Sequence, residues 1–171
     1  MATEFKDLGK NLTKVYEDMA KALPVIEKVS LTAGIADFKL RVFSDASKDV
    51  NERPLGFYKS NYYKTEVKEK LRNTIDLQLT DQLKDSIQVG VDSKRQQAIG
   101  YASNLVRRQN EKAQGGQTIK ARGLTNPRLG EFIDKEFGET IAFNENEATT
   151  VQKIYDREFL KVFNKSMDRV F

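Results

Sequence analysis

Apolar residues recur every three or four positions through most of the first 43 residues. In the first segment these residues are Phe5, Leu8, Leu12, Val15, Met19 and Leu23. Such spacing places them on one stripe of a helix. Pro24 interrupts the pattern, and because proline is tolerated in a first helical turn, we expect a second helix to begin there. Residues 1–44 are therefore predicted to form two helices.

The second of these segments, residues 25–43, is apolar on two faces. One face carries Val29, Ala33, Ala36, Leu40 and Phe43, and the other carries Leu31, Ile35, Phe38 and Val42. An element that is apolar on both sides is usually central, buried by its own domain or by a neighbouring subunit. We expect burial of both faces.

Residues 45–64 lack helical periodicity and are predicted to form a long extended loop. Ser, Asp, Asn, Pro and Gly punctuate the segment, which ends in the aromatic stretch RPLGFYKSNYYK (53–64). Loops of about 20 residues are uncommon in compact domains and are often functional. Composition alone leaves two readings open, since these aromatic side chains either fold back on the core or dock on a partner. The candidate interface residues are Arg53, Leu55, Phe57, Tyr58, Tyr62 and Tyr63.

Residues 65–171 are predicted to form an α+β core with a long C-terminal helix. Helices are expected at 66–72 and 104–113, and a helical turn at 80–86 leads into an antiparallel hairpin within 86–103. Asn126–Pro127 marks another helix start, and Asn144 with Glu147 matches a capping box for the last helix. With 171 residues and 39% hydrophobic content, the chain is expected to be one α+β domain. Its predicted order is two N-terminal helices, a long loop, a small antiparallel sheet and a long C-terminal helix.

Composition argues against catalysis. The chain has no histidine and no cysteine, which removes the usual general base, the commonest metal ligand and the thiol nucleophile. Clustered carboxylates such as Glu131 and Asp134 are expected to be a solvated helix face. We therefore expect no enzyme, no metal and no cofactor or small-molecule substrate. No apolar run approaches 18 residues and MATEFKDLGK contains no apolar segment, so neither a membrane span nor a signal peptide is expected.

Charge is distributed unevenly along the chain, whose net charge is +4. Residues 93–123 carry seven basic residues and one acid, whereas residues 131–147 carry six acids and one lysine. These segments are either solvated faces or surfaces that favour head-to-tail self-association. A nucleic-acid-binding accessory protein is the alternative function, because clustered basic residues bind phosphates. The basic candidates for DNA or subunit contacts are Arg107, Arg108, Lys112, Lys120 and Arg122.

Three stretches resemble the tailed-phage family of virion-morphogenesis proteins, known as tail-completion or head–tail connector proteins. The stretch at 41–64 is similar to a helix end followed by a loop of the type F…G.D.NG.PIG.Y. The stretch LTDQLKDSIQVGV (79–91) resembles LTGxLxxSIxV, and residues 132–154 resemble E.KFG..IF.LT.EE. The positions that match in the loop are Val50, Asn51, Pro54, Leu55, Gly56 and Tyr58. Asp81 and Glu52 stand where the family has glycine, and the family's histidine-containing segment has no counterpart here.

The resemblance implies a structural role in the virion. Such proteins form homo-oligomeric rings at the neck or tail, around the channel that DNA traverses. The implied partners are other copies of the chain, the adjoining portal, neck or tail proteins, and DNA through non-specific contact. The implied location is the neck or tail region of the virion, assembled in the host cytoplasm.

Overall fold

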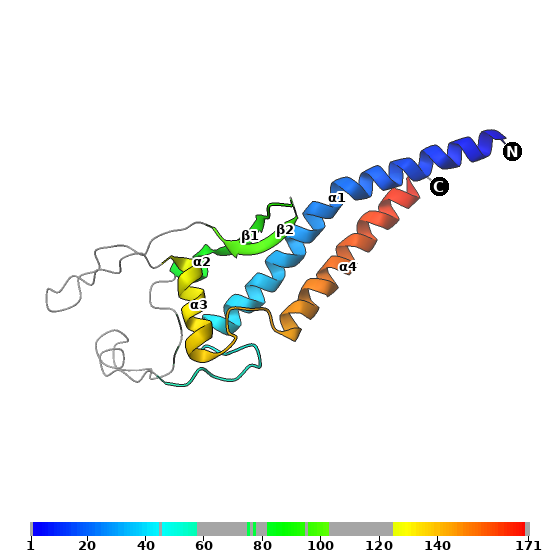
Figure 1. The fold of residues 1–171 in the computed structure, drawn as a ribbon. Helices are drawn as coiled ribbons and strands as arrows, with labels where there is room; N and C mark the ends of the chain where they lie inside the picture. The colour runs from blue at the N-terminus through cyan, green and yellow to red at the C-terminus, as the bar shows by residue number, and fades with distance from the viewer. Residues whose placement is uncertain are drawn as a thin grey trace.

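The computed structural model describes residues 2–44, 46–57, 75, 77, 82–94, 96–102 and 125–169, with side chains from residue 7 on except residue 82. Its elements are α1 (Ala2–Val42), α2 (Gln82–Ser86), β1 (Ile87–Val91), β2 (Gln97–Tyr101), α3 (Asn126–Phe137) and α4 (Glu145–Asp168). Two long helices, α1 and α4, lie side by side and extend away from a smaller body that holds the hairpin and α3 (Figure 1). The α+β class, the small antiparallel sheet and the long C-terminal helix are confirmed. The helices predicted at 66–72 and 104–113 lie outside the described residues.

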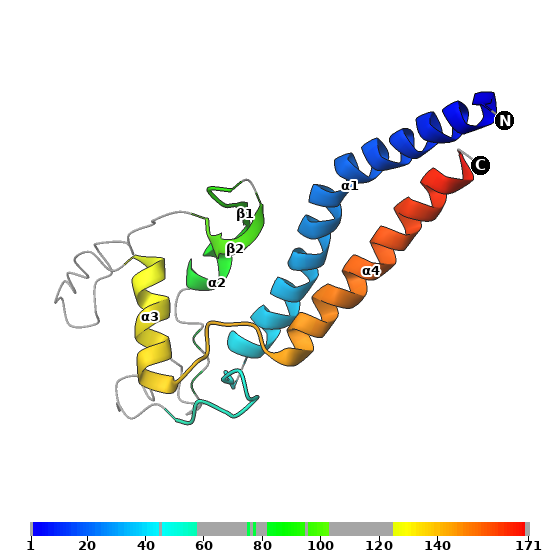
Figure 2. The ribbon, with the colours of Figure 1, turned by 45° about the vertical axis from the view of Figure 1, so that its right-hand side comes forward.

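The prediction of two N-terminal helices is wrong, because α1 runs unbroken through Pro24. Proline removes one backbone hydrogen bond and clashes with the preceding turn, which bends a helix if the flanking residues are held by packing. Met19 and Ile26 are buried on either side of Pro24, so one stripe continues across it. Figure 2 shows α1 changing direction part-way along its length. Pro24 therefore lies inside a helix rather than at a boundary between two helices.

Of the two ways in which both faces at residues 25–43 were expected to be buried, burial within the described part of the chain is found for one face only. Ile35, Phe38 and Val42 are buried, but Val29 is 46% exposed and Leu40 is 72% exposed. On the face that carries Val29 and Leu40, only Phe43, at the end of the segment, lies in the core. The described part of the chain therefore covers one side of this helix and leaves the other to solvent.

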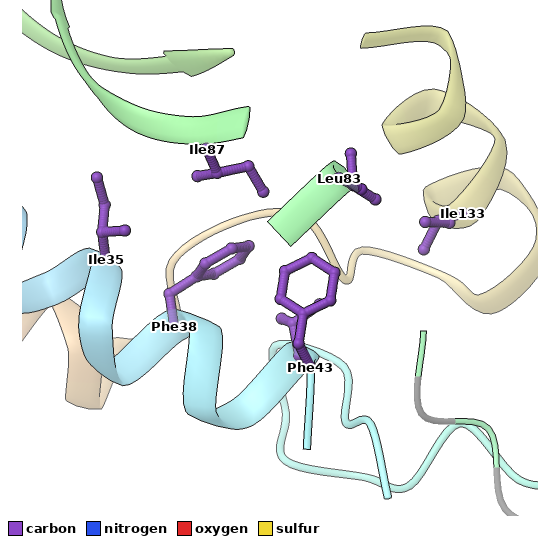
Figure 3. Packing of buried hydrophobic residues seen from close by; sticks show 7 residues of the cluster. Ile35, Phe38, Phe43, Leu83, Ile87 and Ile133 are labelled. Atoms are coloured by element: carbon purple, nitrogen blue, oxygen red, sulfur yellow. The ribbon is translucent and has the colours of Figure 1, made fainter. Parts of the chain in front are cut away.

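The hydrophobic core lies where the C-terminal end of α1 meets the small body. It consists of Ile35, Phe38, Val42, Phe43, Leu83, Ile87 and Ile133, which come from α1 and the residue after it, α2, β1 and α3 (Figure 3). Phe38 packs edge-on against Phe43 with ring centroids 6.2 Å apart. Residues of the N-terminal helix thus share one core with residues far along the chain.

The hairpin is confirmed within its predicted bounds. In the antiparallel pair, Ile87 lies opposite Tyr101 and Val89 opposite Ile99. The carboxylate of Asp92 accepts backbone hydrogen bonds from Lys94 and Gln96, both at 2.8 Å, and so fixes the turn. The start of β1 lies in the core at Ile87, Val89 packs against the core while partly buried, and Val91 at the end of the strand is 62% exposed.

Candidate functional site

The segment after α1 folds as a compact turn from Ala46 to Phe57, the part of the predicted loop that the structure describes. Lys48 pairs with Pro54 in an isolated antiparallel bridge, and Leu55 N donates to Ser47 O at 2.9 Å. We call residues 46–57 the anchored loop. Val50 N donates to Glu139 O at 3.0 Å, so the anchored loop is also bound to the segment between α3 and α4. The predicted loop is therefore non-helical here but is held by specific hydrogen bonds.

Asp49 organises the tip of the anchored loop. Its carboxylate accepts hydrogen bonds from the backbone N–H groups of Asn51 (2.8 Å) and Arg53 (2.9 Å), and its other oxygen faces Arg53 Nε at 3.1 Å. Burial of Asp49 opposes ionisation, but these hydrogen bonds and the positive charge of Arg53 outweigh it and hold the pKa of Asp49 below its ordinary value. The tip is therefore stabilised by an ionised carboxylate.

Glu52, at the tip of the anchored loop, adopts a left-handed backbone conformation with φ of 59°. This conformation suits glycine and is unfavourable for most other residues. The Glu52 carboxylate accepts a hydrogen bond from Asn146 at 2.6 Å and another from Asn144 at 3.4 Å. These contacts to the start of α4 offset part of the backbone cost.

A buried ion pair binds the end of α1 to the start of α4. Arg41 Nε lies 2.6 Å from Glu147 Oε1, and the two side chains are only 6% and 4% exposed. The same guanidinium donates to the carbonyl oxygens of Lys48 (2.9 Å), Thr140 (3.3 Å) and Ala142 (2.5 Å). A buried guanidinium must satisfy its five donors, and here it does so on three different segments. Arg41 thus connects α1, the anchored loop and the segment before α4.

Glu147 has a second role in the capping box of α4, which is confirmed. Asn144 Oδ1 accepts from Glu147 N at 2.9 Å, and Glu147 Oε2 accepts from Asn144 N at 2.8 Å. The carboxylate therefore caps the helix and neutralises Arg41 at the same time. Sequence reasoning found the cap and missed Arg41, although an arginine inside an apolar helical segment is itself a signal of a buried partner.

The described part of the anchored loop contains three of the predicted interface residues. Arg53 is exposed (72% of its side chain) and Phe57 is 67% exposed, whereas Leu55 is half-buried. Phe57 therefore does not fold back on the core. The other predicted interface residues, Tyr58, Tyr62 and Tyr63, lie outside the described residues. So do all the basic candidates: Arg107, Arg108, Lys112, Lys120 and Arg122.

A hollow outside the anchored loop is lined mainly by apolar side chains. An apolar hollow of about 250 Å³ between Phe38, Tyr101 and Phe143 opens from the rim of the core. Burial, and then the charges of Asp134 and Glu131, raise the pKa of the Tyr101 hydroxyl, so this group stays protonated near neutral pH. Among the described residues, no three acidic side chains are grouped so as to hold a metal ion. None of the helices in the described ranges is long and apolar enough to cross a membrane.

No protein-family model, curated protein or solved structure matches this chain.

Proposed function

We propose that this chain is a phage virion structural protein of the head–tail junction, a tail-completion or neck component that acts by assembling with copies of itself into a ring. The observation that carries the proposal is the anchored loop. It holds five of the six matching positions (Val50, Asn51, Pro54, Leu55 and Gly56), is fixed to both long helices, and carries the exposed Phe57. A loop whose backbone is already fixed before binding loses little backbone freedom when its aromatic side chain docks. The loop is therefore suited to contact a neighbouring subunit or an adjoining portal, neck or tail protein.

The conformation of Glu52 supports the resemblance on which the proposal rests. Glu52 stands at a position where the family's loop has glycine, and its φ of 59° is one that glycine adopts at least cost. The departure in residue type therefore leaves the turn geometry compatible with the family's loop. The other departure, at Asp81, lies outside the described residues.

The proposal places the protein in the neck or tail of the virion, after assembly in the host cytoplasm. Its partners are other copies of the chain and the adjoining rings, and DNA in the channel touches the protein only through non-specific contacts. In this role the chain is not an enzyme and needs no cofactor, because its task is to bind and to hold geometry.

The experiment is incorporation of Phe57→Ala into virions. Phe132→Ala on α3 is the matched control, because Phe132 is also an exposed phenylalanine, at 56%, but is not part of the anchored loop. We expect both variants to melt like the wild type, and only Phe57→Ala to be depleted from purified particles when counted by quantitative mass spectrometry. Absence of the wild-type chain from particles would overturn the proposed function. Equal incorporation of the two variants would show that Phe57 is not part of the contact with the partner.

One observation favours the alternative, a nucleic-acid-binding accessory protein. Lys14, Lys21 and Lys28 are exposed and recur every seven residues, so they lie along one side of α1. Such a row spans about 21 Å at 1.5 Å per residue and suits contact with successive phosphates. Replacing all three lysines by alanine should weaken DNA binding by the isolated chain and flatten its salt dependence. Binding that is absent, or insensitive to salt, would exclude this alternative.

A further inference from the structure

The hollow between α1, β2 and the segment before α4 is apolar and open at its mouth. We call it the apolar hollow. Its lining includes Phe38, Ile87, Ile99, Tyr101, Ile141 and Phe143. The buried side chains of Phe38 and Ile87 form its inner end and point toward one another (Figure 3), whereas Ile99 is 38% exposed. Apolar surface that the described residues leave uncovered is a candidate for contact with another molecule.

The size and lining of the apolar hollow suit one aromatic ring. An apolar cavity of about 150 Å³ is large enough to bind benzene, so the volume of about 250 Å³ accommodates a phenylalanine side chain. Phe38 and Phe143 already pack with ring centroids 5.9 Å apart. A third ring at such a separation adds edge-on or tilted aromatic contacts to the area that it buries. The lining therefore favours an aromatic occupant.

Two carboxylates lie on the α3 side of the apolar hollow. Asp134 Oδ1 accepts a hydrogen bond from the backbone N–H of Ile141, a lining residue, at 2.7 Å. The Tyr101 hydroxyl packs against α3 at Gly130, where a Cβ would overlap it, and the exposed Glu131 is the next residue. The negative charges of Asp134 and Glu131 both reach this hydroxyl. An occupant that carries a positive charge beside its aromatic ring is therefore favoured.

The anchored loop presents this combination. Phe57 is 67% exposed, so it does not fill the apolar hollow of its own chain. Arg53 lies four residues before it, at most about 14 Å away between Cα atoms. Asp49 engages Arg53 through Nε at 3.1 Å, and the Arg53 side chain is still 72% exposed. An aromatic ring and a positive charge thus stand close together on one exposed surface.

We propose that Phe57 of one copy inserts into the apolar hollow of a neighbouring copy, with Arg53 beside Glu131 and Asp134 of that neighbour. The inference rests on the proposed function, in which the anchored loop meets a neighbouring subunit, and it names the surface that the loop meets. The contact is heterologous, because the loop and the hollow are different surfaces of the same chain. Repeated from copy to copy, a heterologous contact closes into a ring when the rotation permits.

Two matches select a second copy as the occupant. The Phe57 ring fits the apolar hollow in size, and the positive charge of Arg53 opposes the two carboxylates beside it. A negatively charged occupant would be repelled there. Both matches come from one loop whose backbone is already held by hydrogen bonds, so little backbone freedom is lost on insertion.

The first experiment replaces Phe57 by the photo-crosslinking residue p-benzoylphenylalanine, which keeps an aromatic ring at this position. The full chain is irradiated both as concentrated purified protein and in particles, and the crosslinked peptides are identified by mass spectrometry. Mixing isotopically light and heavy chains separates crosslinks between copies from those within one chain. We expect crosslinks between copies that join residue 57 to β2 or to residues 138–144.

The control carries the same photo-crosslinking residue in place of Phe132, which is 56% exposed on α3. We expect it to yield no crosslink to the lining of the apolar hollow. Crosslinks from residue 57 that fall elsewhere on the neighbouring copy would overturn the proposal. So would the absence of any crosslink between copies in both preparations.

The second experiment closes the apolar hollow with a charge. In the chain that carries the photo-crosslinking residue at 57, Ile99→Asp is compared with Val91→Asp. Val91 is an exposed residue of the same hairpin that does not line the hollow. We expect Ile99→Asp to lower the yield of crosslinks between copies at least about tenfold and Val91→Asp to leave it nearly unchanged. Melting curves show that both variants fold, and equal yields would overturn the proposal.

The third experiment swaps the charges across the contact. Arg53→Glu and Glu131→Arg each place like charges together and should each lower the crosslink yield. The double variant, Arg53→Glu with Glu131→Arg, restores opposite charges and should regain most of the yield. Glu136→Arg, at another exposed position of α3, is the control for Glu131→Arg. A double variant no better than the single variants would overturn the pairing of Arg53 with Glu131.

The same experiments separate this inference from the proposed function. Crosslinks from residue 57 to the apolar hollow of another purified copy, together with absence of the chain from particles, would overturn the proposed function and leave this contact standing. A chain that is present in particles but crosslinks from residue 57 only to a different protein would overturn this contact and leave the proposed function standing.

Discussion

The two ends of α1 have similar amphipathic patterns and different surroundings. At the C-terminal end, Phe38 and Val42 lie in the core and Arg41 is bound to three other segments. At the N-terminal end, Leu12 and Tyr16 repeat the helical spacing but are largely exposed. A periodic apolar pattern therefore reports that a helix has a face to bury, not which molecule buries it. The apolar side chains of the first end are buried within this fold, whereas the described residues leave those of the second end largely exposed.

The largest effect should come from breaking the buried ion pair. Glu147→Ala leaves the Arg41 guanidinium buried without its counter-charge and removes the cap of α4, so we expect a loss of about 3–5 kcal/mol in the free energy of unfolding. Urea unfolding would measure it. The double variant Arg41→Met with Glu147→Leu should lose much less, because it leaves no buried charge. If Glu147→Ala lowered the free energy of unfolding no more than Glu145→Ala at an exposed position, the C-terminal end of α1 would not be held by the buried ion pair.

The two glycines of α1 give the next contrast. Gly34→Ala places a methyl group against Val151 and Phe143 in the α1–α4 contact, and we expect a loss of about 1–3 kcal/mol from overpacking. Gly9→Ala should instead stabilise the dilute chain by up to about 1 kcal/mol. Thermal melting of the two variants side by side tests the sign of each change. A destabilising Gly9→Ala at low concentration would show that Gly9 is packed against another part of its own chain.

The sequence predicts a structural feature well when the residues that determine the feature lie close together in the chain. The hairpin, the start of α3 and the capping box of Asn144 and Glu147 follow from residues within a few positions of one another, and all three are confirmed. The predicted helix boundary at Pro24 was wrong because the effect of a proline inside a helix depends on whether another helix, here α4, packs on both sides of it. Arg41 was missed because its partners are seven to 106 residues away in the chain. In the candidate site, composition left open whether the aromatic side chains fold back on the core, and the structure shows Phe57 exposed. The hydrogen bonds that fix the anchored loop were not predicted.

Asp49 in the anchored loop should make the stability of the fold depend on pH in the acid range. Its pKa is lower in the folded chain than its ordinary value of 3.8, so the ionised form stabilises the fold. That contribution is present in full above the unfolded pKa and is lost as the pH falls through the folded pKa. We expect Asp49→Asn to cost about 1–2 kcal/mol near pH 7, and the difference from the wild type to shrink below about pH 4. Urea unfolding from pH 7 to pH 2 measures it, and a gap that stays constant would contradict the role of the carboxylate.

The smallest predicted effect isolates the backbone of Glu52. Glu52→Ala and Glu52→Gly both remove the carboxylate that Asn144 and Asn146 contact. The two variants then differ in the free-energy cost of the left-handed φ of 59° and in the freedom of the unfolded chain. Alanine retains that cost and glycine does not, while glycine gains freedom in the unfolded chain. We expect the glycine variant to be more stable than the alanine variant by up to about 1 kcal/mol, the reverse of their order in the helix at Gly9. Chemical denaturation of the pair measures it. If alanine proved the more stable, the turn would relax without its left-handed residue, and Glu52 would cease to support the resemblance to the family's glycine.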